Sequence, residues 1–100
     1  MKISVITVCY NSENSIRQTI NSVLEQTHND IEYIIIDGNS KDKTKEIIFQ
    51  YKNFLNNIVS EDDKGIYDAI NKGIKLSNGE IISILHSDDI FYNKDVCKNV

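Results

Sequence analysis

The sequence contains no proline, no internal repeat and no low-complexity stretch, so nothing in it marks a linker between domains. Its 100 residues, 40% of them hydrophobic, are enough for one small domain whose core is incompletely buried. We therefore expect a single domain of modest stability over residues 1–100.

Basic residues are too few and too dispersed to form a nucleic-acid-binding surface. The chain has 11 Lys and Arg against 15 Asp and Glu, which gives a formal net charge of −4 and no stripe of positive charge. An acidic pocket that binds an anion needs a cation to offset the repulsion. We expect no nucleic-acid partner, and a cation wherever a phosphate group binds.

Cysteines and long apolar runs are also scarce. Cys9 and Cys97 lack any CxxC or Cys/His spacing, which argues against structural zinc and predicts reduced thiols in an intracellular protein. The apolar run of residues 3–9 is too short for a signal-peptide core or a bilayer span, and polar residues 11–14 follow it directly. The expected location is the cytoplasm, including the inner face of the membrane.

The common phosphate-binding motifs are missing as well. No GxGxxG follows the first apolar run, and GxxxxGK[ST] occurs nowhere, which argues against the commonest dinucleotide and ATP sites. If a phosphate ligand binds, its charge must be balanced by a metal ion and by a basic side chain such as Lys64. A metal-bridged diphosphate fits this sequence better than a P-loop nucleotide.

The sequence does contain short β-branched runs that alternate with amphipathic segments. Strands are predicted over residues 3–8, 32–36, 57–60 and 80–85. Apolar residues recur at helical spacing between them, in a first helix with Ser12 or Asn14 able to cap its start, a second helix reaching Leu55, and a third over residues 66–76. This order predicts a three-layer αβα fold with a mostly parallel, Rossmann-like sheet in the strand order 3-2-1-4.

Polar residues gather where the predicted strands end. In a sheet of that order, ligands bind beyond the carboxyl ends of the first and fourth strands, where the winding reverses. Residues 9–11 follow the first strand, residues 37–40 the second, and residues 86–89 the fourth. We expect the functional site at this edge.

Two adjacent acids, Asp88 and Asp89, are the sharpest feature of that edge. They follow an apolar strand, so two carboxylates are held at a hydrophobic rim where their mutual repulsion must be offset. Mg²⁺ or Mn²⁺ would offset it, because both ions prefer oxygen ligands and are held by one or two carboxylates together with substrate phosphates. Asp also caps helices and turns, and the spacing alone leaves both interpretations open.

Four ordered segments resemble the glycosyltransferase family 2 enzymes, and together they cover essentially the whole chain. They are residues 4–11 (SVITVCYN) with 22–27 (SVLEQT), residues 32–44 (EYIIIDGNSKDKT), residues 63–73 (DKGIYDAINKG), and residues 77–89 (SNGEIISILHSDD), the last of which is similar to the run into a DXD-type metal motif. The resemblance implies a GT-A fold and transfer of a sugar from a nucleoside diphosphate with inversion at the anomeric carbon.

The resemblance also implies roles for particular residues. Thr7 and Tyr10 would line the nucleoside pocket, Asp37 would accept a hydrogen bond from the base, and Lys64 would contact the diphosphate. Asp88 would reach the ribose or a metal-bound water, and Asp89 would coordinate the metal; Ser87 replaces the first acid of a literal DXD.

The same resemblance places the catalytic base of an inverting enzyme further along the chain, beyond Val100, so we assign no catalytic residue within residues 1–100 and expect a truncated donor-binding half. The implied acceptor is a glycan or a lipid-linked acceptor, in surface polysaccharide or glycan biosynthesis. A noncatalytic nucleotide-binding or assembly module of the same fold is the alternative. A receiver-like module fits less well, because it needs acids after the first strand, where this chain has Cys9, Tyr10 and Asn11.

The apolar edge of the fourth strand predicts self-association of the chain.

Overall fold

The computed structural model describes residues 2–27 and 30–86. Strands and helices alternate along them as the periodicity predicts. The elements are β1 (Ile3–Cys9), α1 (Ile16–Leu24), β2 (Ile31–Asp37), α2 (Thr44–Gln50), the 3-10 helix η1 (Lys52–Phe54), β3 (Asn57–Ser60), α3 (Ile66–Leu76) and β4 (Ile81–His86).

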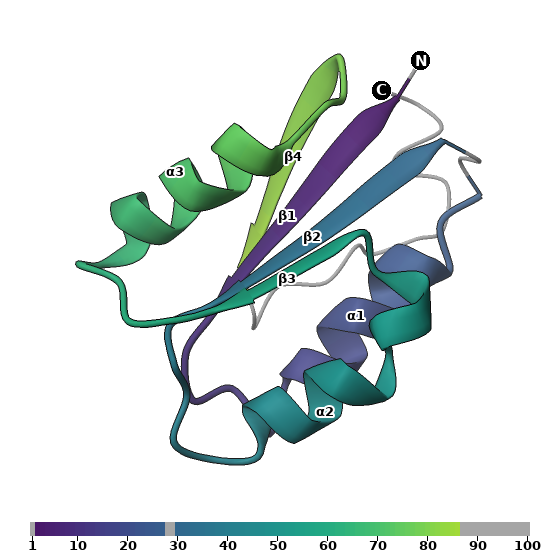
Figure 1. Ribbon diagram of the computed structural model, residues 1–100. Coiled ribbons are helices and arrows are strands. Elements are labelled where there is room, and N and C mark those ends of the chain that lie inside the picture. The colour runs from purple at the N-terminus through teal and green to yellow at the C-terminus, as the bar shows by residue number, and fades with distance from the viewer. Residues whose placement is uncertain (1, 28–29, 87–100) are drawn as a thin grey trace.

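The four strands form one parallel sheet in the order β3-β2-β1-β4, which confirms the predicted topology (Figure 1). The register aligns the strand ends, because Cys9 lies opposite Asp37 and Val8 opposite His86. The residues that follow β1, β2 and β4 therefore leave the sheet at one edge. That edge is where an α/β sheet of this winding binds its ligands.

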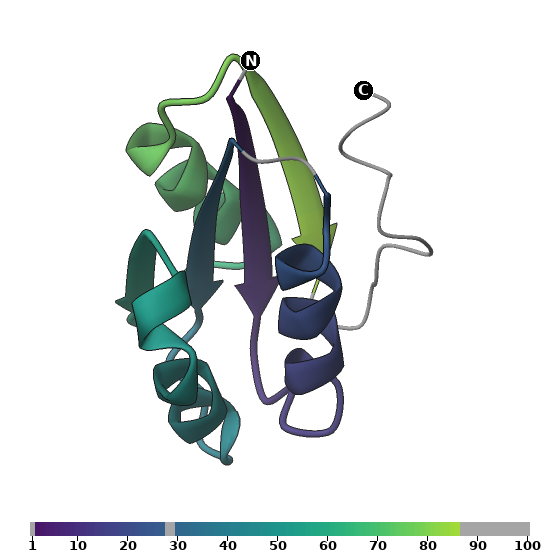
Figure 2. The ribbon, with the colours of Figure 1, turned by 90° about the vertical axis from the view of Figure 1, so that its right-hand side faces the viewer.

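Helices cover both faces of the sheet. Figures 1 and 2 show α1 and α2 together on one side and α3 on the other. One apolar cluster joins Ile20 of α1 and Ile48 of α2 to β1 residues such as Val5. A second cluster joins Ala69 of α3 to Ile6 and Val8 of β1. Since β1 is buried on both faces, its run of β-branched residues is continuous instead of alternating with polar residues.

The contact of α3 with the sheet depends on Gly73. A Cβ atom added to Gly73 would lie 2.5 Å from Cγ2 of Ile6, well inside van der Waals contact. The helix can approach β1 this closely only because residue 73 has no side chain.

Two details of the predicted helices are wrong. The second helix was expected to reach Leu55, but α2 ends at Gln50 and the chain continues through η1. Leu55 keeps an apolar contact with the core from outside the helix, which explains the helical spacing of its sequence position. Neither Ser12 nor Asn14 is the N-cap of α1; Ser15 is, and Ser12 contributes its carbonyl oxygen to the N–H groups of Ser15 and Ile16.

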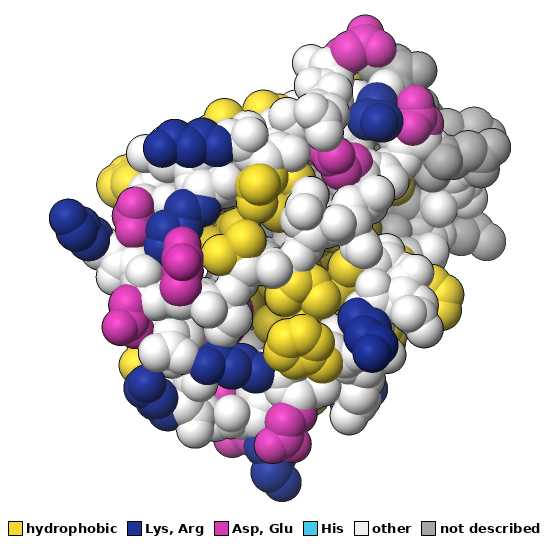
Figure 3. Space-filling model, in the orientation of Figure 1, with side chains coloured by type: hydrophobic (Ala, Val, Ile, Leu, Met, Phe, Trp, Pro, Cys, Tyr) yellow, Lys and Arg dark blue, Asp and Glu magenta, His cyan; other side chains and the backbone are white. Residues whose placement is uncertain are grey.

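The exposed surface is mixed in character. The face in Figure 3 shows basic and acidic side chains interspersed around exposed apolar ones. No helix within residues 2–27 and 30–86 combines the length and apolar character that a bilayer span requires.

Candidate functional site

A cavity of about 690 Å³ opens at the carboxyl edge of the sheet, where the site was predicted. Its lining comes from three parts of the chain: the end of β1 and the following loop, the start of α3, and the end of β4. The residues are Val8, Cys9, Tyr10, Asn11, Ser12, Asn14, Ser15, Asp63, Gly65, Ile66, Ala69 and His86. Its volume lies within the range of small-molecule pockets.

Tyr10 lies in this cavity with 58% of its surface exposed. A large aromatic side chain left open beside a cavity offers a stacking surface to a planar ligand. The placement agrees with the nucleoside-binding role expected for Tyr10, and the contact with a base stays a prediction.

Thr7 does not line the cavity, contrary to the sequence-based expectation. Its side chain is fully buried on the α1/α2 face of the sheet, where its Oγ1 lies 2.8 Å from the hydroxyl of Tyr33. Thr7 shares the strand face of Ile3 and Val5, both in the core cluster beneath α1 and α2. Burial raises the pKa of Tyr33 well above its usual range although the bond to Thr7 opposes the shift, so the phenol stays protonated.

Asp37 is also fully buried, and the structure does not present its carboxylate to a ligand. The two oxygens accept hydrogen bonds from the backbone N–H of Ser40 at 3.0 Å, from the Ser40 hydroxyl, and from the Ser60 hydroxyl at 2.9 Å. Every one of these donors belongs to the protein, which corrects the prediction that Asp37 contacts the base. Its carboxylate joins the ends of β2 and β3 to the loop before α2.

Cys9 completes the surroundings of Asp37. Its thiol donates to Oδ1 of Asp37 at 3.5 Å. Burial, followed by the negative charge of Asp37 and the hydrogen bond to it, raises the pKa of Cys9 well above its usual range. Cys9 is therefore a protonated structural thiol and not a nucleophile, although it lines the cavity.

Asn11 fixes the loop that carries Tyr10. It has a positive φ of 48°, a conformation that Asn tolerates better than most residues. Its backbone N–H donates to the Ser40 hydroxyl at 2.8 Å, and its Oδ1 accepts the N–H of Lys41 at 2.8 Å. The loop after β1 is thus held against the loop after β2.

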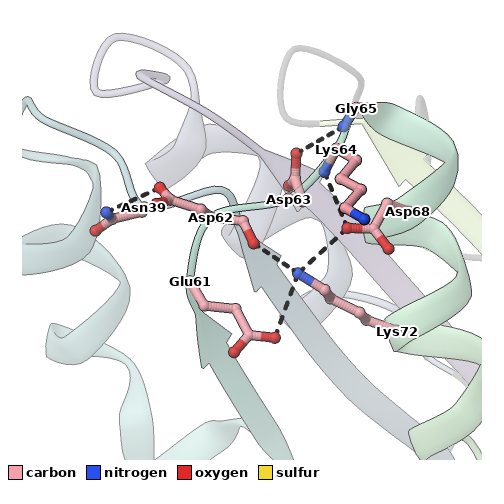
Figure 4. Close-up of polar contacts among 8 residues, drawn as sticks. All are labelled: Asn39, Glu61, Asp62, Asp63, Lys64, Gly65, Asp68 and Lys72. Carbon is pink, nitrogen blue, oxygen red and sulfur yellow. Dashed lines mark hydrogen bonds and ion pairs between the residues drawn. The ribbon is translucent and has the colours of Figure 1, made fainter.

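The loop of residues 61–65, between β3 and α3, is held from both sides (Figure 4). On one side, the Asn39 side chain donates to Oδ1 of Asp62 at 3.1 Å. On the other, Nζ of Lys72 donates to the carbonyl oxygen of Asp62 at 3.0 Å and pairs with Glu61 at 3.3 Å and with Asp68 at 3.5 Å. Desolvation acts to lower the pKa of Lys72, but these carboxylates outweigh it and raise that pKa above its usual value. Residues 61–65 are therefore held in place from both sides, and two of them, Asp63 and Gly65, line the cavity.

Asp63 on this loop is a site residue that the sequence analysis missed. It lines the cavity together with Tyr10. The signal was present, because the rule that ligands gather beyond the carboxyl ends of parallel strands applies to β3 as well as to β1 and β4.

Lys64 and His86 complete the described candidates. Lys64 is exposed and lies between the lining residues Asp63 and Gly65, but it does not line the cavity itself; its backbone N–H donates to Asp68 at 2.9 Å. Its contact with a diphosphate stays a prediction. His86, at the end of β4, does line the cavity.

The predicted acid pair, Asp88 and Asp89, lies outside the described residues. Within residues 2–27 and 30–86, His, Cys, Asp and Glu form no group of three that is suited to hold a metal ion. The chain leaves β4 at His86, in the cavity wall, and the two acids follow two and three positions later in the sequence.

The sequence of the chain matches a known protein family. The model of Glycosyl transferase family 2 matches residues 4–100. The chain belongs to this family. It is 39% identical over 90 residues to an uncharacterized glycosyltransferase of Rickettsia typhi, covering 90% of this chain and 28% of that protein. It is 37% identical over 90 residues to the glycosyltransferase TuaG of Bacillus subtilis, assigned to teichuronic acid biosynthesis, covering 87% of this chain and 36% of that protein.

Solved structures show the same fold. Residues 1–349 of S. aureus TarS, crystallised in complex with UDP-GlcNAc, match with a TM-score of 0.89 and 33% identity, covering 99% of this chain and 30% of that one. The mannosyltransferase PcManGT of Pyrobaculum calidifontis, in complex with GDP-Man and Mn²⁺, matches with a TM-score of 0.90. Its sequence identity is 24%, so this likeness shows a shared fold and nothing more. The chain spans about a third or less of the length of these proteins.

Proposed function

We propose that residues 1–100 are the donor-binding part of a glycosyltransferase that moves a sugar from a nucleoside diphosphate to an acceptor with inversion. One observation carries the proposal: the cavity with the exposed Tyr10 ring lies at the carboxyl edge of β1 and β4 in a chain of family 2. The likeness to TarS, which was crystallised with UDP-GlcNAc, supports a nucleoside diphosphate sugar as the ligand.

The nucleoside part of the donor would lie in the cavity. Tyr10 offers an aromatic face, while Ile66 and Ala69 at the start of α3 supply apolar surface. The diphosphate would extend toward the end of β4, with Lys64 as the basic side chain that contacts it. No step here needs Thr7 or Asp37, since both side chains are buried and engaged within the protein.

A divalent cation, Mg²⁺ or Mn²⁺, would neutralise the charge that develops on the leaving diphosphate. Asp89 would hold the cation, and Asp88 the ribose or a water on the metal. The support is the donor set: two carboxylates that come two and three positions after His86, the last residue of β4, which lines the cavity.

The proposal for the acceptor side of the reaction rests on the family resemblance and on the relatives, which are longer than this chain. The base that deprotonates the acceptor hydroxyl would be a carboxylate beyond Val100. The likeness to TuaG supports a role in surface polysaccharide assembly, for which we propose a glycan or lipid-linked acceptor. The proposed location, the cytoplasm including the inner face of the membrane, rests on the sequence alone. A noncatalytic nucleotide-binding module of the same fold remains the second candidate, because the cavity would bind a donor without the base.

We also propose self-association through β4. Among the described residues β4 pairs only with β1, and Ile82 on it is 41% exposed. An apolar strand edge with unpaired backbone groups is a template for another chain. Light scattering should detect oligomers that dissociate on dilution, whereas a monomer at high concentration would contradict the proposal.

Ligand-dependent stability tests the donor-binding role. We expect UDP or another nucleoside diphosphate, together with Mn²⁺ or Mg²⁺, to stabilise the chain by about 2.7 kcal/mol at a ligand concentration 100 times Kd. EDTA should remove much of this gain, and so should Asp89→Ala. If no nucleoside diphosphate changes Tm with either metal, the proposed function is wrong.

A further inference from the structure

We infer that Asp63 reads the nucleobase, so that the site selects bases with a ring N–H group (uracil, thymine and guanine) over adenine and cytosine. The inference rests on the proposed function, because it takes the cavity to be a nucleoside site. It moves base recognition from the end of β2, where Asp37 was expected to perform it, to the loop between β3 and α3.

The two carboxylate oxygens of Asp63 have different surroundings. Oδ1 accepts the backbone N–H of Gly65 at 3.2 Å, a bond drawn in Figure 4. Oδ2 accepts no hydrogen bond from any residue within 2–27 and 30–86. Asp63 is half-buried and shares the cavity wall with Tyr10. One oxygen therefore orients the carboxylate, while the other leaves an acceptor open to a ligand.

Gly38 makes this arrangement possible. A Cβ atom at residue 38 would lie 2.9 Å from Oδ2 of Asp63 and 3.4 Å from Cδ1 of Tyr10. Oδ2 and the Tyr10 ring are therefore neighbours above the backbone of Gly38. A side chain at residue 38 would displace the carboxylate.

The same point of the backbone shows why Asp37 cannot substitute for Asp63. The Asp37 carboxylate, one residue earlier, is fully buried and bonded to the Ser40 and Ser60 hydroxyls. Asp63 is the acid that the structure brings to the open side of Gly38.

The position of Asp63 is fixed before any ligand binds. Its neighbour Asp62 is tied to Asn39 through its side chain and to Lys72 through its carbonyl oxygen. Preorganisation of this kind makes a hydrogen bond selective, because the acceptor does not move to suit a different partner.

An ionised carboxylate accepts hydrogen bonds and donates none. Uracil and thymine present the ring N3–H on the edge remote from the ribose, and guanine presents N1–H. Adenine and cytosine carry a lone pair at the equivalent ring nitrogen, which Oδ2 would repel. When a base lies against Tyr10 with this ring nitrogen facing Oδ2 of Asp63, a hydrogen on the nitrogen makes the contact attractive and a lone pair makes it repulsive. A charge-assisted hydrogen bond of this kind changes affinity by roughly tenfold or more.

Asp63→Asn tests the inference, because the amide has nearly the same shape but offers a donor as well as an acceptor. Dissociation constants for UDP, GDP, ADP and CDP with Mn²⁺ should be measured by calorimetry on the wild-type chain and the variant. We expect the wild type to favour UDP over CDP by at least about tenfold, and Asp63→Asn to bring that ratio to within about threefold. Asp30→Asn removes an equal charge from an exposed position before β2 and should leave the ratio unchanged.

Gly38→Ala is the second variant. It keeps the acid but pushes the end of a flexible side chain aside, so the fold should survive while UDP binding weakens about tenfold. A UDP to CDP ratio that Asp63→Asn leaves at its wild-type value would overturn the inference and leave the proposed function standing. Failure of every nucleotide to bind the wild type would instead overturn the proposed function.

Discussion

Glu32 of β2 accepts a hydrogen bond at 2.7 Å from the backbone N–H of Asn78, which lies 46 residues later between α3 and β4. The same carboxylate accepts the Asn78 side-chain amide at 3.2 Å and the Ser4 hydroxyl at 2.8 Å. Ser4 in turn accepts the N–H of Gly79 at 2.8 Å. These bonds fix the start of β4 at the edge of the sheet opposite the cavity.

Glu32→Ala should lower the free energy of unfolding by about 2 kcal/mol or more, because it leaves the Ser4 hydroxyl and the N–H groups of Asn78 without their acceptor. Glu32→Gln should cost less. Desolvation raises the pKa of Glu32, but the bonds from Asn78 and Ser4 outweigh it and hold that pKa below its usual value. The contribution of this charge is therefore complete above the unfolded pKa of about 4.3 and is lost as pH falls through the folded value. Urea unfolding should show the gap between wild type and Glu32→Gln closing only in acid; a gap that widens there would contradict the linkage.

The raised pKa of Cys9 predicts a loss of stability in alkali. Above the usual thiol pKa of about 8.5 the unfolded chain releases this proton while the folded chain keeps it, so stability falls by up to about 1.4 kcal/mol per pH unit. Cys9→Val should remove this slope. Urea unfolding of both proteins at pH 7, 8, 9 and 9.5 measures it, and parallel curves would show that Cys9 ionises freely in the fold.

Asp37→Ala should act on the fold and not only on ligand binding. It leaves the N–H and hydroxyl of Ser40 and the hydroxyl of Ser60 without their acceptor, which we expect to cost about 3 kcal/mol. Chemical denaturation checks the value. A variant of wild-type stability that has lost base affinity would restore Asp37 to the base-binding role.

Gly73→Ala should destabilise the chain by about 1–3 kcal/mol, because the new methyl group collides with Ile6. Ile6→Ala removes the three side-chain atoms of Ile6 that the added methyl group meets, so the double variant should be less destabilised than the sum of the two single variants. A double-mutant cycle on unfolding free energies measures the coupling. Strict additivity would mean that α3 moves away from the sheet without cost.

The fold could be predicted from the sequence because hydrophobic periodicity determines it almost everywhere. The end of α2 could not, since Tyr51 and Leu55 keep a helical spacing while packing on the core from outside the helix. The polar edge was also predictable, from the positions where the strands end.

The division of roles among the residues at that edge was not predictable. Thr7 lies in a strand buried on both faces, where alternation does not say which face meets a ligand. The engagement of Asp37 depends on Ser60, which is 23 residues away, and the importance of Asp63 depends on its approach to Gly38. These are contacts between distant segments, and no local pattern encodes them.

Chemical-shift mapping tests the central claim, that the cavity at the carboxyl edge is the donor site. Amide ¹H–¹⁵N spectra of the chain should be recorded during titration with UDP in the presence of Mg²⁺. We predict that the shifts concentrate at Tyr10, Asn11, Gly65 and Ile66, which line the cavity, and are small at Asn78 and Gly79 on the opposite edge. Saturable shifts centred on Asn78 and Gly79, or none at the cavity residues, would contradict the account.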